Sequence, residues 1–166
     1  AVPDQLLLLG SSEYEAYRAF APRVRAQVVA NAIDMAPTVR EARERFDEHG
    51  HLKLVFIGRL VAAKGLFEAI EAIALLRDQG LQVDFVIAGS GVDEQRLRSE
   101  VAARGLGDRI SFAGAVFGQA KMRLLSQAQV LLYPSYSEGL PYALLEGMAA
   151  GALPVTCPVS AIPDVI

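Results

Sequence analysis

Short runs of consecutive apolar residues recur through the last two thirds of the chain, and segments with helical spacing separate them. Leu66, Ile70 and Ile73, for example, would lie on one face of a helix. The apolar runs predict strands buried on both faces, because such strands need no alternation of apolar and polar residues. The predicted strands are Leu52–Ile57, Val83–Ala88, Ile110–Ala113, Val130–Tyr133 and Leu153–Thr156. The predicted helices are Leu66–Arg77, Asp93–Arg104, Gln119–Ala128 and Tyr142–Ala150.

The first fifty residues follow a less regular pattern. They predict a strand, a helix and a second strand, at Leu6–Leu9, Glu13–Phe20 and Gln27–Val29. Ser11 or Ser12 is expected to cap the helix, because a hydroxyl there can accept a hydrogen bond from a free backbone N–H. Residues 35–50 are polar and charged and contain a further predicted helix, Thr38–Glu48. We therefore expect this segment to link two structural units.

The alternation of strands and helices after residue 50 predicts an α/β fold. Strands that are apolar at consecutive positions are typical of a parallel sheet covered by helices on both faces. We therefore predict a doubly wound, Rossmann-like parallel sheet over residues 51–166. In such sheets ligands bind at the carboxyl ends of the strands, so the residues that follow each strand are the first candidates for a site.

Composition narrows the function classes. Hydrophobic residues make up 52% of the 166 residues, which is enough for a core and excludes a disordered chain. A net charge of −3 offers no broad basic surface, so we expect no nucleic-acid partner. No apolar run is long enough to cross a bilayer. Cys157 is the only cysteine, so no disulfide can form within the chain, which fits a reducing compartment.

The first candidate segment runs from Gly58 to Gly65, between a predicted strand and a predicted helix. Arg59 and Lys64 place two cations on this connection. A bound diphosphate would meet both side chains, because arginine can bind two oxygens at once and lysine adds a mobile charge. The segment is not a Walker P-loop, since Gly-Lys-Ser/Thr is missing. Taken alone, it is more simply interpreted as a solvated loop with two surface cations.

The second candidate segment is Gly89-Ser90-Gly91, which also follows a strand. Glu94 occupies the place of the third glycine in a dinucleotide fingerprint, so this motif is weak evidence of a cofactor site. It is compatible with a tight turn or with a backbone that lies close to a bound phosphate or sugar.

The third candidate segment contains Glu138 and Glu146, separated by seven residues around the start of a predicted helix. Pro141 fits the first helical turn, where the missing N–H costs nothing. Glu146 would lie in an otherwise apolar helix, and a buried carboxylate needs hydrogen-bond donors such as ribose hydroxyls. Glu138 could accept hydrogen bonds from sugar hydroxyls. Alternatively, Glu138 is an acid at the helix start that the helix dipole favours, and Glu146 is exposed on the surface.

Together these segments resemble the C-terminal domain of GT-B glycosyltransferases, specifically the retaining family 4. The family pattern Gly-Arg-Leu followed by Lys-Gly is similar to Gly58–Leu60 and Lys64-Gly65. The family's two spaced glutamates match Glu138 and Glu146, in a run that ends Leu-Leu-Glu-Gly-Met-Ala. Three further segments fall in the expected order: Gly89–Gly91, Ile110–Gly114 and Pro134-Ser135. The resemblance covers about the whole chain.

The resemblance implies a role for each segment. Arg59 and Lys64 would bind the donor diphosphate and stabilise the charge that develops on it, with Glu138 as the third catalytic residue, in contact with the donor sugar. Glu146 would hold the nucleotide ribose. The remaining donor-binding residues would be Gly58, Gly89, Gly91, Gly114, Ala115, Val116, Gly139, Leu140, Pro141 and Tyr142, with residues 114–116 near the nucleobase. The family is generally metal-independent, so no metal ligands are expected. No glycosidase-like pair of catalytic carboxylates is implied.

The resemblance also implies substrates and a division of the chain. The donor would be a UDP-, GDP- or ADP-sugar, and no separate cofactor is expected. Residues 1–50 would be the end of an N-terminal domain with the interdomain linker, and residues 51–166 an incomplete donor-binding domain. The acceptor, a glycan, lipid or small molecule, would bind through the missing part of the N-terminal domain, so this chain alone should be inactive. A cytoplasmic location is expected, with peripheral contact at the inner face of the membrane left open.

Some positions depart from the family pattern. Gln129 stands where members often have aspartate, Ala32 stands in place of a linker glycine, and Ser160-Ala161 replaces a usual Gly-Gly pair. His49 and His51 flank the linker and are expected to be solvated. Two alternatives to a glycosyltransferase remain. One is a nucleotide-sugar-binding module without catalysis, and the other is a different GT-B enzyme such as a sugar-nucleotide epimerase.

Overall fold

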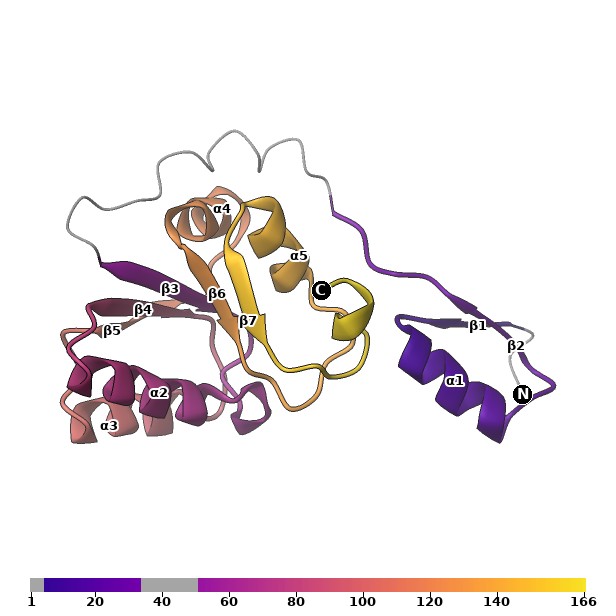
Figure 1. The fold of residues 1–166 in the computed structure, drawn as a ribbon, viewed down its shortest axis with the longest axis horizontal. Coiled ribbons are helices and arrows are strands. Elements are labelled where there is room, and N and C mark those ends of the chain that lie inside the picture. The colour runs from indigo at the N-terminus through magenta and orange to yellow at the C-terminus, as the bar shows by residue number, and fades with distance from the viewer. Residues whose placement is uncertain (1–4, 34–50) are drawn as a thin grey trace.

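The computed structural model describes residues 5–33 and 51–166 of the chain (Figure 1). Its larger part is a five-stranded sheet with the strand order β5-β4-β3-β6-β7. The strands are β3 (Leu52–Ile57), β4 (Val83–Ala88), β5 (Ile110–Gly114), β6 (Val130–Tyr133) and β7 (Leu153–Thr156). All neighbouring strands are parallel, which confirms the predicted α/β fold class.

Helices cover both faces of this sheet (Figure 1). The α2 helix (Leu66–Asp78) and the α3 helix (Glu94–Ala103) lie on one face, and α4 (Gly118–Gln127) and α5 (Tyr142–Ala149) lie on the other. Each strand therefore contributes to two cores. In β3, Phe56 packs into the core under α2 and α3, whereas Val55 and Ile57 pack into the core under α4 and α5. This two-sided burial explains why consecutive residues of the strand are apolar.

The chain order of the strands reverses beside β3. From β3 the chain moves outward through β4 to β5, and it then returns to the other side of β3 to form β6 and β7. The connections that follow β3 and β6 therefore leave toward opposite faces of the sheet. Such a reversal leaves a crevice at the carboxyl ends of the two strands, where ligands bind in open α/β sheets.

The first part of the chain forms a smaller unit. Strands β1 (Gln5–Leu8) and β2 (Arg25–Val28) pair in parallel, and α1 (Ser11–Phe20) connects them. The predicted serine cap of α1 is wrong, because Gly10 occupies the N-cap position. Ser12 Oγ instead donates to the carbonyl of Ser160, at 3.0 Å, and the Ser11 N–H donates to Asp164, at 2.6 Å.

The smaller unit also contacts the loop that precedes α5. The side-chain amide of Asn31 donates to the carbonyl of Leu140, at 2.5 Å. The predicted helix Thr38–Glu48 lies outside the described residues. Within the described ranges, no helix combines the length and the apolar character needed to cross a membrane.

Helix boundaries differ from the predicted ones by one or two residues, and most differences concern caps. The α1 helix begins at Ser11, two residues earlier than expected. Pro141 is the N-cap of α5, in extended conformation, and not a residue of its first turn. Two short 3-10 helices, η1 (Ala62–Lys64) and η2 (Ile162–Asp164), complete the fold. The η1 helix matters for function, because it carries Lys64 to the carboxyl end of the sheet.

Gly65 fixes the approach of η1 to the loop after β6. Its φ of 69° lies in the left-handed region, which favours glycine. A Cβ at this position would lie 2.0 Å from the carbonyl oxygen of Pro134. Only glycine therefore allows the two segments to pack this closely.

We predict that Gly65→Ala destabilises the protein by more than the left-handed conformation alone explains. The matched control is Gly105→Ala, because Gly105 has a similar φ of 62° and a Cβ added there would have no described atom within 4 Å. The control should lose about 1–2 kcal/mol of unfolding free energy from backbone strain. Gly65→Ala should lose at least about 1 kcal/mol more, because backbone must shift. Equal losses in urea denaturation would contradict this account.

Candidate functional site

A cavity of about 410 Å³ lies at the carboxyl ends of β3 and β6. Its walls come from the loop after β3, the η1 helix, the start of α4 and the start of α5. It is lined by Ile57, Gly58, Arg59, Lys64, Val116, Phe117, Lys121, Tyr133, Glu138, Pro141, Tyr142, Ala143 and Glu146. The structure thus brings together the four charged residues that the sequence singled out, Arg59, Lys64, Glu138 and Glu146.

A second hollow of about 270 Å³ adjoins the first, and the two share Ile57, Gly58, Arg59, Val116 and Phe117. It extends the site toward Gly89 and Ala115, which were predicted to contact the donor. Four other predicted contact residues line neither hollow: Gly91, Gly114, Gly139 and Leu140. Leu140 is buried, and its carbonyl accepts a hydrogen bond from Asn31.

The Gly89–Gly91 segment is a tight turn packed against the loop after β3. A Cβ at Gly89 would lie 1.8 Å from the carbonyl oxygen of Gly58, and one at Gly91 would lie 2.2 Å from that of Leu60. The Leu60 N–H donates to the Ser90 carbonyl at 2.9 Å. Backbone packing therefore accounts for both glycines, and it also holds the loop that carries Arg59.

Lys64 and Glu138 form a buried ion pair across the cavity wall. The ammonium group of Lys64 donates to Glu138 Oε1, and the two side chains are only 10% and 8% exposed. The residues are 74 positions apart in the sequence. Glu138 is therefore a partner of Lys64, in addition to preceding the start of α5. A buried lysine and glutamate need such mutual pairing, because each charge alone is costly to bury.

The loop that carries Glu138 is attached to the η1 and α2 region. The Tyr136 N–H donates to the Ala63 carbonyl at 2.9 Å, and the Tyr136 hydroxyl donates to Glu68 at 2.7 Å. This side-chain hydrogen bond raises the pKa of Tyr136. The two contacts fix the loop next to η1, so Glu138 faces Lys64.

Glu146 forms a second ion pair, with Lys121 of α4. The distance from Lys121 Nζ to Glu146 Oε1 is 2.5 Å, and the side chains are 25% and 19% exposed. Glu146 Oε2 is buried and accepts no hydrogen bond from the described residues. The interpretation of Glu146 as an exposed residue is therefore wrong. Sequence reasoning missed Lys121, because nothing in its helical segment indicates that α4 packs against α5.

Arg59 is the least constrained charge in the site. It is exposed and lines both hollows. Among the described residues it has no ion pair or hydrogen bond. Its guanidinium group is therefore available to an anion that enters from solvent.

Tyr133 is a further residue that the sequence reasoning missed. Its ring stacks on Phe56, with 5.2 Å between centroids, and Lys64 Nζ lies 5.9 Å from its ring centroid. Burial raises the pKa of the Tyr133 hydroxyl well above its ordinary value, and the charge of Glu138 raises it further. The hydroxyl is therefore neutral and able to donate a hydrogen bond, and Tyr133 is one of the residues that line the cavity. Its place directly before Pro134-Ser135 was the available signal.

The N-terminus of α5 also faces the cavity. Tyr142 and Ala143, in its first turn, line the wall. No described side chain caps this helix, and its N-cap is Pro141. The first N–H groups of a helix have no intrahelical acceptor and carry partial positive charge, so this end favours an anion or a sugar oxygen.

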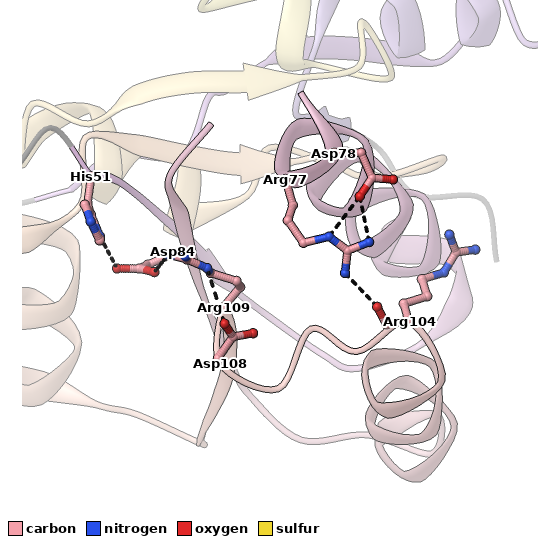
Figure 2. Close-up of polar contacts among 7 residues, drawn as sticks. All are labelled: His51, Arg77, Asp78, Asp84, Arg104, Asp108 and Arg109. Atoms are coloured by element: carbon pink, nitrogen blue, oxygen red, sulfur yellow. Dashed lines mark hydrogen bonds and ion pairs between the residues drawn. The ribbon is translucent and has the colours of Figure 1, made fainter. Parts of the chain in front are cut away.

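The opposite end of the sheet has a different electrostatic character (Figure 2). His51 and Arg109 both contact Asp84, at 3.5 Å and 3.6 Å, and Arg109 also lies 3.6 Å from Asp108. Nearby, Arg77 donates to Asp78 and to the carbonyl of Arg104 (Figure 2). His51 is thus partly exposed and paired, while His49 lies outside the described residues. A hollow of about 340 Å³ here contains no residue predicted for the site.

Metal ligands are not gathered in the described residues. No group of three or more histidine, cysteine, aspartate or glutamate side chains there is arranged to hold a metal ion. The positive charges that line the cavity are those of three side chains, Arg59, Lys64 and Lys121.

Known proteins resemble this chain in sequence and in fold. The amylovoran biosynthesis glycosyltransferase AmsK of Erwinia amylovora is 35% identical over 124 residues, which cover 71% of this chain and 30% of AmsK. The structure of a mutant of S. aureus TarM in complex with UDP, among other ligands, has a TM-score of 0.83 at 16% identity, covering 97% of this chain and 31% of that one. Anabaena HepE in complex with UDP and glucose has a TM-score of 0.79 at 15% identity, covering 98% of this chain and 47% of HepE.

The chain spans about a third of the length of AmsK and TarM. The likeness to the two solved structures supports the Rossmann-like half of a GT-B fold. The profile of the family described as glycosyl transferases group 1 matches residues 22–166, which is most of the chain. This chain therefore belongs to the glycosyl transferases group 1 family.

Proposed function

We propose that this chain forms the donor-binding site of a glycosyltransferase that uses a nucleoside-diphosphate sugar. The observation that carries the proposal is the convergence of Arg59, Lys64, Glu138 and Glu146 on one cavity. The cavity lies at the carboxyl ends of β3 and β6, where a doubly wound sheet binds its ligands. Its residues offer cations for a diphosphate and carboxylates for hydroxyl groups.

The diphosphate is assigned to the side of the cavity that holds Arg59 and Lys64. Arg59 has no counter-charge among the described residues, so its interaction with phosphate has no existing bond to replace. Lys64 donates to Glu138 with one N–H, and an ammonium group has two more. The N-terminus of α5, which no described side chain caps, adds a third positive element. These groups would stabilise the charge that grows on the leaving diphosphate as the sugar is transferred.

The sugar hydroxyls are assigned to Glu138 and the ribose to Glu146. Glu138 is held by Lys64, so its free lone pairs have a fixed direction. Glu146 has one oxygen without a donor among the described residues, and a ribose hydroxyl would supply it. Val116 and the neighbouring Phe117 would lie near the nucleobase. UDP is the nucleotide to test first, because the TarM and HepE structures of similar fold contain it. GDP is the alternative, because a 34% identical relative from Xanthomonas campestris is a GDP-mannose:cellobiosyl-diphosphopolyprenol alpha-mannosyltransferase.

We further propose a retaining mechanism without a metal ion. Glu138 and Glu146 are each engaged by a lysine, which suits binding roles and not those of a glycosidase acid–base pair. Arg59 and Lys64 would supply the charge that a divalent cation supplies in other transferases. The acceptor, a glycan, lipid or small molecule, would bind to a part of the protein outside this chain. The single cysteine fits a reducing compartment, and we propose a cytoplasmic location.

Arg59→Ala is expected to weaken UDP binding by at least about 1.5 kcal/mol, because a charge-assisted contact to phosphate is lost. Isothermal titration calorimetry on the protein from its complete reading frame, without added metal, measures this. Arg98→Ala is the matched control, since Arg98 pairs with Glu94 on α3 and lines neither hollow. Unchanged affinity in Arg59→Ala would refute the diphosphate assignment.

Lys64 needs a paired design, because removing it alone leaves Glu138 buried without a partner. The double variant Lys64→Met with Glu138→Gln removes both charges and keeps the side-chain volumes similar. Calorimetry should show a loss of at least about 1.5 kcal/mol for inorganic pyrophosphate as well as for UDP. Full pyrophosphate affinity in a variant with native thermal stability would exclude Lys64 from the diphosphate site.

Glu146→Gln is expected to weaken UDP binding by about 1.5 kcal/mol while leaving pyrophosphate binding nearly unchanged. The reason is that pyrophosphate has no ribose, whereas the substitution removes the negative charge that holds the ribose hydroxyls. The same calorimetric titrations provide both values. Equal losses of binding free energy for UDP and pyrophosphate would contradict the assignment of Glu146 to the ribose.

A further inference from the structure

Lys121 occupies a place in the site that the predicted donor contacts do not explain. It lies in the first turns of α4 and reaches Glu146 on α5, 25 positions later in the sequence. Both side chains line the 410 Å³ cavity, and both are mostly buried. The pair therefore forms part of the wall and is not a surface contact between two helices.

The pair has unused hydrogen-bonding capacity on both partners. An ammonium group has three N–H donors, and within the described residues Lys121 uses one of them, toward Glu146 Oε1. Glu146 Oε2 is buried without a donor from the same part of the chain. The terminal torsion of glutamate is soft, so a small rotation would present either oxygen to the cavity. A ligand there would meet donors and acceptors side by side.

A vicinal diol fits this arrangement better than a phosphate does. Each hydroxyl group can donate one hydrogen bond and accept others. A phosphate only accepts, and the carboxylate of Glu146 would repel it. The buried Glu146 Oε2 lacks a hydrogen-bond donor among the described residues, and a hydroxyl group can supply one whereas a phosphate cannot. Arg59 offers a phosphate a cation without any counter-charge among the described residues.

We propose that Lys121 is a further donor-binding residue, which binds the two ribose hydroxyls together with Glu146. The hydroxyls donate to the Glu146 carboxylate, and the free N–H groups of Lys121 donate to the oxygen atoms of the same hydroxyls. This inference rests on the proposed function, because it assigns a second residue to the ribose end of the donor site. Lys121 and Glu146 together would discriminate ribose from deoxyribose more strongly than the Glu146 carboxylate alone.

The test compares three ligands by calorimetry on the protein from its complete reading frame. The ligands are UDP, 2′,3′-dideoxy-UDP and inorganic pyrophosphate. Lys121→Met should weaken UDP binding at least about tenfold, as expected for a hydrogen bond from a charged donor. Binding of dideoxy-UDP and pyrophosphate should change less than about twofold, because neither ligand has the diol. Lys121→Arg, which keeps the charge and the donors, should recover part of the UDP affinity.

Arg123→Met is the matched control for this experiment. Arg123 lies on the same helix and is exposed, and among the described residues its side chain hydrogen-bonds only to Gln119, weakly, at 3.5 Å. It should leave all three affinities unchanged, and the thermal stability of each variant without ligand reports on folding.

The outcomes separate this inference from the proposed function. If the unmodified protein binds none of UDP, GDP and ADP, the proposed function fails, and the role of Lys121 fails with it. If it binds only GDP or ADP, the same comparison is made with that nucleotide and its 2′,3′-dideoxy analogue. If the protein binds UDP but Lys121→Met loses all three ligands equally, or loses none, the diol role of Lys121 is overturned and the donor site stands. A loss confined to UDP, with partial recovery in Lys121→Arg, supports the inference.

Discussion

The parallel pairing of β3 with β6 is the constraint on which the site depends. Leu54 and Val55 pair with Val130 and Leu131, and this register brings two distant stretches of sequence to the same edge of the sheet. Because the chain order reverses here, the following loops separate and leave room between them. Every charge in the cavity is carried on an element that starts from this pair of strands or packs beside it.

The charges of the cavity are arranged mostly as pairs. Two lysines hold two glutamates, so these side chains bury little unbalanced charge, which a folded protein tolerates poorly. Arg59 differs, because it is exposed and unpaired among the described residues. A site of this kind keeps its carboxylates oriented before a ligand arrives, so less ordering is needed on binding.

Much of this arrangement could be predicted from the sequence, because it depends on patterns among residues that are close together along the chain. The fold class followed from apolar runs and helical spacing, and the importance of Arg59, Lys64, Glu138 and Glu146 followed from motifs at strand ends. Lys121 and the pairing of Lys64 with Glu138 were not predictable, because they depend on how elements pack in three dimensions. The cap of α1 was mispredicted for the same reason, since Ser12 binds the carbonyl of distant Ser160.

The hydrogen bond from Asn31 to the Leu140 carbonyl has a mechanical consequence. Leu140 lies two residues after Glu138, on the loop that leads into α5. A rotation of the first unit against the sheet must either break this bond or pull the loop with it. The β1-α1-β2 unit and the Glu138 carboxylate are therefore mechanically coupled. The coupling runs through one hydrogen bond and the short stretch of backbone from Glu138 to Leu140.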